Sequence, residues 1–251
     1  VLPITNPLRV AEESATLDHL SKGRLDFGVG RSSLTKFYDG FNVDYAKSNS
    51  LFWESLEIIQ KAWTEDRFSY CGDHYSFRNV ELVPKTYQKP HPPIRVAVAS
   101  RDTFIDVGAK GYPIFVSSTT PFDELKVRIS LYQRSWEKAG NPGIGDIMLR
   151  VPCYIADTHL KSITEPESST RSAMKYAATN LATTAGSSDA AKGYKEISSI
   201  QYEDMVRERV LYGTPSEIIN RIAFLVEELS LSGLVLEMNY GGQIPHQRVM
   251  R

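Results

Sequence analysis

The chain has 251 residues, of which 41% are hydrophobic, 10% aromatic and 24% charged. This composition is ordinary for a globular protein and argues against a disordered one, because there is ample apolar material to bury. A net charge of −1 argues against a general nucleic-acid binder, which needs an excess of positive charge. No apolar run approaches the ~20 residues that span a bilayer. Cys71 and Cys153 are expected as free thiols in a cytoplasmic protein.

Five short apolar runs are typical of strands that are covered on both faces. In chain order, these runs are residues 25–29, 94–99, 113–117, 149–156 and 234–238. Residues 67–79 predict a hairpin that turns at Cys71-Gly72-Asp73, and Val1-Leu2-Pro3 is expected to be the tail of a further strand.

Between these runs the apolar period becomes helical, with spacings of i, i+4, i+7 and i+11. The three stripes are Phe52, Leu56, Ile59 and Trp63; Leu125, Ile129, Tyr132 and Trp136; and Ile218, Ile222, Leu225 and Leu229. Helix starts are predicted where a capping side chain precedes a proline, at Asn6-Pro7, Thr120-Pro121 and Thr214-Pro215. Glu217 completes a capping box with Thr214.

The alternation of strands and helices predicts parallel pairing in a single α/β domain over residues 1–251. Residues 186–200 are small and polar, and we expect them to form a mobile loop. Such a loop is either a lid over an active site or a disordered surface insertion, and composition alone favours neither.

One candidate site follows the first strand, where Gly28 and Gly30 precede Arg31. This is not the dinucleotide-binding fingerprint, because Ser33 stands where a third glycine is needed and no helix is expected there. The glycines would let a ligand approach the backbone, and Arg31 would then reach an anionic group. The alternative is an ordinary surface arginine.

A second candidate site is the start of the helix that follows the strand at 94–99. The hydroxyls of Ser100 and Thr103 are expected beside unpaired backbone N–H groups, an arrangement that suits a phosphate. The alternative is that Ser100 simply caps the helix. None of the five histidines has a metal-ligand spacing, so no metal site is predicted.

Several segments, in their order and spacing along the chain, resemble the luciferase-like monooxygenase family. They are Asn6 to Glu13, Leu17 to Leu25, Phe27 to Arg31, Gly40-Phe41, Pro90 to Ile94, Gly213 to Pro215 and Glu237 to His246. The resemblance implies a (β/α)8 TIM barrel. It also implies an enzyme that takes reduced FMN from a separate flavin reductase, adds O2 to form a flavin hydroperoxide, and oxidises a small organic substrate. A homodimer or a dimer of related subunits is expected.

The resemblance also assigns roles to individual residues. Arg31, Ser100 and Thr103 match the family's contacts with the flavin phosphate, Ala99 matches a backbone contact, and Asn6 matches a polar residue near the flavin ring. The segment 186–200 matches the mobile active-site loop. Asn49 stands where many relatives carry a second phosphate-binding arginine, so a weaker flavin affinity is expected.

Aligned to the family, the chain is expected to lack roughly 80–90 residues at its front, judging by about 30 residues per βα unit, and to stop inside the last helix. Only about five full strands would then be present. The family's catalytic histidine would lie in the missing part, so the catalytic residues are unknown and this piece alone is expected to be inactive. Open apolar edges at residues 25–29 and 234–238 predict that it is unstable or aggregates when expressed alone. Two alternatives stay open: a deazaflavin-dependent oxidoreductase on the same barrel and a non-catalytic partner subunit.

Overall fold

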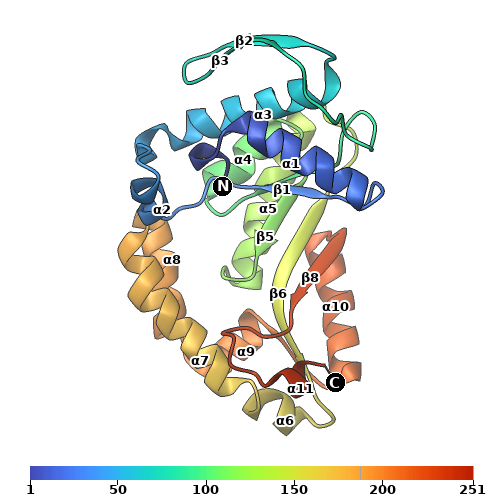
Figure 1. Ribbon diagram of the computed structural model, residues 1–251. Coiled ribbons are helices and arrows are strands. Elements are labelled where there is room, and N and C mark those ends of the chain that lie inside the picture. Colours follow the sequence, from blue (N-terminus) through green and yellow to red (C-terminus); the bar gives the residue numbers. More distant parts are fainter. Residues whose placement is uncertain (187, 251) are drawn as a thin grey trace. The chain divides into compact units, whose positions relative to one another are not determined.

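The computed structural model describes residues 1–186 and 188–250, and its chain divides into two compact units, Val1–Ala97 and Val98–Arg251. Each unit combines helices with parallel strands (Figure 1). The expectation of one domain over the whole chain stays a prediction.

The first unit combines a pair of parallel strands with helices and an antiparallel hairpin. Its helical elements are η1 (Leu2–Ile4), α1 (Pro7–Leu20), α2 (Thr35–Gly40), η2 (Tyr45–Lys47) and α3 (Ser48–Thr64), and its strands are β1 (Phe27–Val29), β2 (Phe68–Cys71), β3 (Ser76–Val80) and β4 (Ile94–Ala97). Strands β1 and β4 pair in parallel, with Phe27 opposite Ile94 and Val29 opposite Val96. The predicted hairpin is confirmed as β2 and β3, which pair antiparallel beside α3 (Figure 1).

Helices α1 and α3 pack together to form the core of the first unit. The predicted stripe on α3 is confirmed, because all four of its residues are buried. The last of them, Trp63, donates a hydrogen bond from Nε1 to the carbonyl of Ala11 at 3.1 Å. Asn6 caps α1 as predicted, since its Oδ1 accepts from the backbone N–H of Leu8 at 3.0 Å.

The second unit is built around the nine-residue strand β6. Its strands are β5 (Ile114–Ser117), β6 (Ile147–Ile155), β7 (Leu211–Gly213) and β8 (Gly233–Glu237), and its helical elements are α4 (Arg101–Ala109), α5 (Phe122–Lys138), α6 (His159–Thr164), α7 (Glu167–Tyr176), η3 (Ala177–Leu181), η4 (Ala182–Thr184), α8 (Ser188–Ser199), α9 (Tyr202–Glu208), α10 (Pro215–Leu229) and α11 (His246–Val249). β6 pairs in parallel with β5, β8 and β7. The predicted parallel α/β arrangement is therefore confirmed in this unit.

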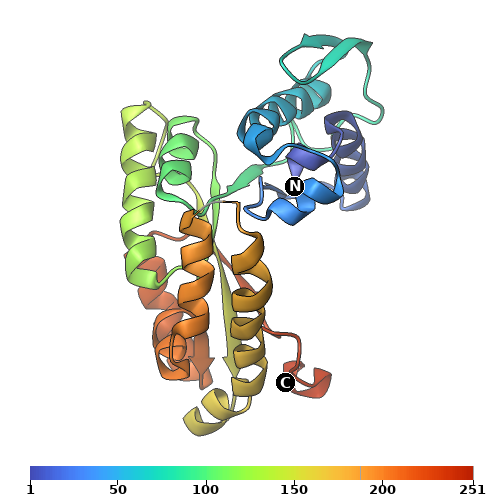
Figure 2. The same ribbon diagram turned by 90° about the vertical axis from the view of Figure 1, so that its left-hand side faces the viewer.

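Helices α4 and α5 lie side by side in close contact (Figure 2). Gly108 makes this approach possible, because a Cβ at this position would lie 2.6 Å from the backbone oxygen of Tyr132. The apolar stripe predicted on α5 is fully buried, and three of the four residues of the stripe on α10 are buried. The capping box of Thr214 and Glu217 is present at the start of α10.

Four expectations about local structure are corrected. Val1-Leu2-Pro3 is not a strand, because Leu2–Ile4 forms a 3-10 helix. The segment 186–200 is not a loop: residue 187 lies outside the described residues, and α8 occupies Ser188–Ser199. Helix α5 begins at Phe122, so Pro121 takes the N-cap position that was expected for Thr120. Strand β7 follows α9 where no strand was expected.

Candidate functional site

Arg31 follows the end of β1 and is held by its neighbours in the first unit. Its Nη1 donates to Oγ of Ser48 at 3.1 Å, and its guanidinium lies 6.0 Å from the ring centre of Tyr45. The hydroxyl of Tyr38 donates to the carbonyl of Arg31. No described carboxylate forms an ion pair with Arg31, so its charge is available to an anion.

The two glycines beside Arg31 differ in their surroundings. A Cβ at Gly28 would meet no atom within 4 Å, whereas a Cβ at Gly30 would lie 3.2 Å from Cβ of Ala97. Gly28 therefore leaves open space at the backbone, as a closely approaching ligand requires. Asn49, which stands in the first turn of α3, is exposed.

Ser100 and Thr103 lie together at the N-terminus of α4. Their hydroxyl oxygens are 2.7 Å apart, and Oγ of Ser100 accepts the backbone N–H of Thr103 at 3.4 Å. Ser100 is therefore the helix cap, and the capping alternative is confirmed. Both hydroxyls are partly exposed and face the positive end of the helix dipole, so the arrangement also suits a phosphate.

The other cations near this helix start are neutralised within the protein. Glu124 forms ion pairs with Arg101 at 3.0 Å and with Arg128 at 2.9 Å. These two arginines hold the pKa of the Glu124 carboxyl below its ordinary value. Arg128 also donates to the carbonyl of Ala99, the residue at which a backbone contact is expected.

The structure brings Ser100 and Thr103 into direct contact, and it places Gly28, Gly30 and Arg31 in succession at the end of β1. Arg31 belongs to the first unit, and the two hydroxyls belong to the second. Asn6 uses its side-chain oxygen to cap α1 and is exposed. The flavin contacts assigned to all these residues stay predictions.

A cavity of about 420 Å³ lies in the second unit and was not predicted from the sequence. One wall comes from residues in or after strands β5, β6 and β8: Thr119, Arg150, Glu237, Tyr240 and Gly241. The other wall comes from α7, η3 and α8: Ser172, Ala173, Tyr176, Ala177, Leu181, Tyr194 and Ile197. Helices α7 and α8, which carry most of this wall, contact each other (Figure 2).

The strand wall of the cavity carries charge. Nη2 of Arg150 in β6 lies 2.6 Å from Oε2 of Glu237, the last residue of β8. Tyr240 stands beside this pair, and burial together with the Glu237 charge raises the pKa of its phenol. A charged pair inside otherwise apolar strands is a signal that the sequence does contain, since Arg150 and Glu237 interrupt two of the predicted runs.

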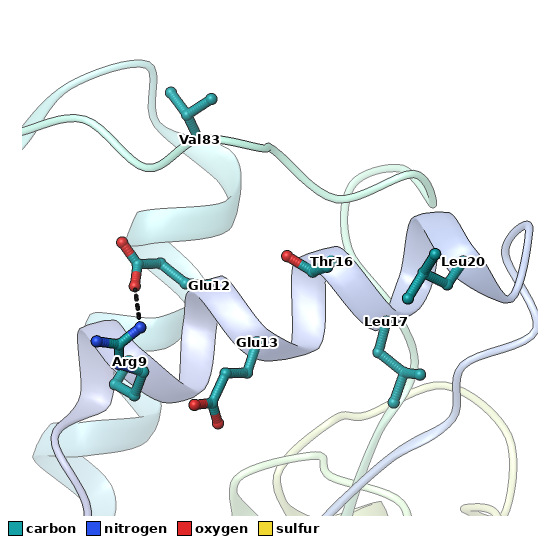
Figure 3. Close-up of a pocket in the computed structure, with 7 residues that line it drawn as sticks. All are labelled: Arg9, Glu12, Glu13, Thr16, Leu17, Leu20 and Val83. Atoms are coloured by element: carbon teal, nitrogen blue, oxygen red, sulfur yellow. Dashed lines mark ion pairs between the residues drawn. The ribbon is translucent and has the colours of Figure 1, made fainter.

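A second hollow lies on the first unit, along α1 (Figure 3). Arg9 and Glu12 form an exposed ion pair of 3.5 Å there. Leu17, Leu20 and Val83 also line it and are all more than half exposed. The hollow contains no polar side chain that is buried, so it offers no chemistry comparable with that of the cavity.

The histidines are used mainly within the protein. Nε2 of His19 donates to the carbonyl of Lys85 at 2.8 Å, and His91 lies against Trp63 with ring centres 5.8 Å apart. In the described part of the chain, no three His, Cys, Asp or Glu side chains are grouped to hold a metal ion. None of the helices in that part is both long and apolar enough to cross a bilayer.

Comparisons with known proteins give one consistent relationship. The family model described as luciferase-like monooxygenase matches residues 1–232. The alkanal monooxygenase alpha chain of Photorhabdus luminescens is 26% identical over 268 residues, covering 97% of this chain and 71% of that protein. The protein y4wF of Sinorhizobium fredii is 39% identical over 97 residues, covering 39% of this chain but only 28% of its own length.

Solved structures support the same fold. The monooxygenase RslO1 from Streptomyces bottropensis matches 99% of this chain and 71% of its own, with a TM-score of 0.80 and 24% identity. The oxygenating constituent of 3,6-diketocamphane monooxygenase of Pseudomonas putida, in complex with FMN, matches 94% of this chain and 70% of its own with a TM-score of 0.73 and 18% identity. An F420-dependent secondary alcohol dehydrogenase matches 98% of this chain and 76% of its own, with a TM-score of 0.71 and 16% identity. The predicted α/β barrel class is therefore confirmed, and the chain is shorter than these structures.

Proposed function

The chain belongs to the luciferase-like monooxygenase family, and we propose that it is the oxygenating part of a flavin-dependent monooxygenase that uses reduced FMN and O2. The family includes flavin-dependent and F420-dependent enzymes, as two of the matched structures illustrate. The observation that carries the proposal is the pair of hydroxyls at the N-terminus of α4. Two hydroxyl donors at the positive end of a helix suit the phosphate that distinguishes FMN from riboflavin.

The residues present fit the proposed cofactor. The resemblance assigns the positive charge for the phosphate to Arg31, which no described carboxylate neutralises and whose direction Ser48 fixes within the first unit. Ser100 and Thr103 would donate their hydroxyl protons to phosphate oxygens, and Gly28 would leave room at the backbone. Ala99 and Asn6 are assigned to the same flavin by resemblance. Bound reduced FMN would supply the electrons that activate O2 for transfer of one oxygen atom to an organic substrate.

A flavin reductase would supply the reduced FMN, and a second subunit of the same fold is a natural partner. The names of two matched proteins point this way, since one is an alpha chain and another an oxygenating constituent. The chain's own activity, substrate and partners are proposals, because it spans 28% of one curated relative and 71% of another.

The test is an anaerobic titration that compares reduced FMN with reduced riboflavin, followed by flavin fluorescence. We expect Arg31→Ala to weaken FMN binding about tenfold, which corresponds to ~1.4 kcal/mol, and to leave riboflavin binding nearly unchanged. Thr103→Val is the matched variant at the helix, because it removes one hydroxyl and leaves the Ser100 cap in place. Arg24→Ala is the control, since Arg24 is an exposed arginine of the same unit.

Equal affinity for FMN and riboflavin would contradict the phosphate site. A second candidate function is an F420-dependent oxidoreductase, because an enzyme of that kind shares this fold with a TM-score of 0.71. Tighter binding of F420 than of FMN in the same titration would select it. Binding of neither would leave the non-catalytic partner subunit.

A further inference from the structure

The cavity of the second unit has two walls of opposite character. The helix wall is apolar and aromatic, with Tyr176, Leu181 and Ile197 among its residues. Ile197 is only 3% exposed and belongs to the buried cluster behind this wall. A volume of about 420 Å³ falls in the range of small-molecule sites, which are mostly apolar with a few placed polar groups.

The strand wall presents the charged groups. Arg150 and Glu237 form an ion pair, with 39% and 27% of their side chains exposed. A guanidinium has five N–H donors, and the Glu237 contact uses the Nη2 end. Arg150 therefore keeps donors that a ligand in the cavity can reach.

A second arginine lies directly behind this wall. Arg209 is 4% exposed, and it donates from Nη1 to the carbonyl of Thr119, a residue that lines the cavity. Its Nε is buried and has no hydrogen-bond partner in the described structure. Arg209 also acts electrostatically on Tyr240 of the wall, so the charge of Arg209 acts on a residue that lines the cavity.

No described carboxylate forms an ion pair with Arg209. The carboxylates with the largest electrostatic effect on Arg209 are those of Glu208 and Glu196. Glu208 lies 2.7 Å from Arg207, which it shares with Asp204 at 2.6 Å, and Glu196 pairs with Lys192 at 3.9 Å. Arg150 and Glu237 balance each other in the wall, and Arg209 is the buried cation of the layer behind it. A buried positive charge favours an anion in a neighbouring cavity more strongly than a surface charge does.

Building on the proposed function, we propose that this cavity binds the organic substrate and that the substrate is an apolar molecule with one carboxylate. The carboxylate would lie at Arg150, where the free donors of the guanidinium allow a charge-assisted hydrogen bond. The apolar part would lie along Tyr176, Leu181 and Ile197. Glu237 would weaken the binding, because its own carboxylate competes for Arg150 and repels a second negative charge.

The experiment compares two probes with one skeleton, 4-phenylbutanoate and 4-phenylbutan-1-ol, by isothermal titration calorimetry on the flavin-free chain. We expect the acid to bind about tenfold more tightly than the alcohol, because only the acid pairs with Arg150. Arg150→Gln should remove this preference, and Glu237→Gln should increase it. The opposite signs of these two changes distinguish a ligand effect from a general loss of structure.

Arg134→Gln is the matched control, because Arg134 is an exposed arginine on α5 and does not line the cavity. The proposal is wrong if the alcohol binds as well as the acid, if Arg150→Gln keeps the preference, or if Glu237→Gln lowers it. Displacement of bound FMN by the acid would also overturn it, since the cavity would then belong to the flavin. Binding of the acid by a chain that binds no flavin would support the cavity and contradict only the proposed function.

Discussion

The two cysteines show how the position of a residue in the fold determines the reactivity of its side chain. Cys71 is exposed at the end of β2, whereas Cys153 is buried in β6. Burial raises the pKa of the Cys153 thiol to about 11, because a thiolate loses its hydration inside the protein. The thiolate is the reactive form of cysteine, so the two side chains should react at very different rates.

We predict that a thiol-specific disulfide reagent modifies one cysteine per native chain at pH 8 and two per unfolded chain. Cys71→Ser should abolish the rapid reaction of the native protein, and Cys153→Ala should leave it unchanged. The measurement is the absorbance of the released thiolate with and without denaturant. Rapid modification of Cys153 in the native chain would contradict the buried position of β6.

At the scale of elements, the capping box of α10 is a local device with a measurable pH dependence. Oε2 of Glu217 accepts from the backbone N–H of Thr214 at 2.7 Å and from its hydroxyl at 2.9 Å. These bonds, followed by His159, hold the pKa of the Glu217 carboxyl below its ordinary value of 4.5. A lowered pKa means that the folded state favours the carboxylate, so the contribution exists above pH 4.5 and is lost as the pH falls through the lowered pKa.

We therefore expect Glu217→Ala to destabilise the protein at pH 7 and to have a smaller effect at pH 3. Thr214→Ala, which removes the capping hydroxyl itself, should cost about 1 kcal/mol at pH 7. The free energy of unfolding from urea titrations at both pH values checks this. An effect of Glu217→Ala that is equal at the two pH values would exclude the carboxylate as its source.

The other end of α10 carries backbone strain that a single substitution should relieve. Ser230 has φ 52° and ψ 44°, the left-handed conformation that glycine adopts without penalty. Ser230→Gly should stabilise the protein by up to about 1 kcal/mol, less the entropy that glycine adds to the unfolded chain. Gly140→Ala, after α5, is the reverse control, because Gly140 has φ 76° and a Cβ there would touch nothing. Urea midpoints that move the same way for both variants would contradict the argument.

Local chemistry in the sequence predicts much of the element order. A cap such as Asn6 and a stripe such as that of α3 depend only on residues within one helix, and both are confirmed. The helix α8 was missed because its small polar residues conceal Tyr194 and Ile197, which face the buried cluster at helical spacing. Strand β7 was missed because three residues are too few to show a period.

The candidate site also has a part that local sequence predicts and a part that only the fold brings together. Ser100 and Thr103 are three residues apart on one helix, so the sequence predicts their contact directly. Arg150, Glu237 and Arg209 lie far apart in the chain, and only the pairing of β6 with β8 and the fold around them bring them to one cavity. Arg150 and Glu237 can be recognised in the sequence as charged residues within apolar strands, but no local pattern identifies Arg209.

At the scale of the whole molecule, the open question is whether the two units unfold together. The expectation of one domain predicts a single cooperative transition, although the chain divides into compact units at Ala97. Helix α3 in the first unit and strand β6 in the second both contain fully buried residues, such as Ile59 and Leu149. The slowest-exchanging amides of each unit should therefore report its complete opening.

For one domain, native-state hydrogen exchange followed by mass spectrometry should give α3 and β6 the same opening free energy and the same dependence on urea. Thr214→Ala, a change on α10 of the second unit, should then accelerate exchange equally in both elements, because a cooperative domain shares every loss of stability. Under independent unfolding, the variant would accelerate β6 and leave α3 unchanged, which would refute the single domain. The same experiment on Ser230→Gly should slow both elements together, so that the two variants test the coupling with opposite signs.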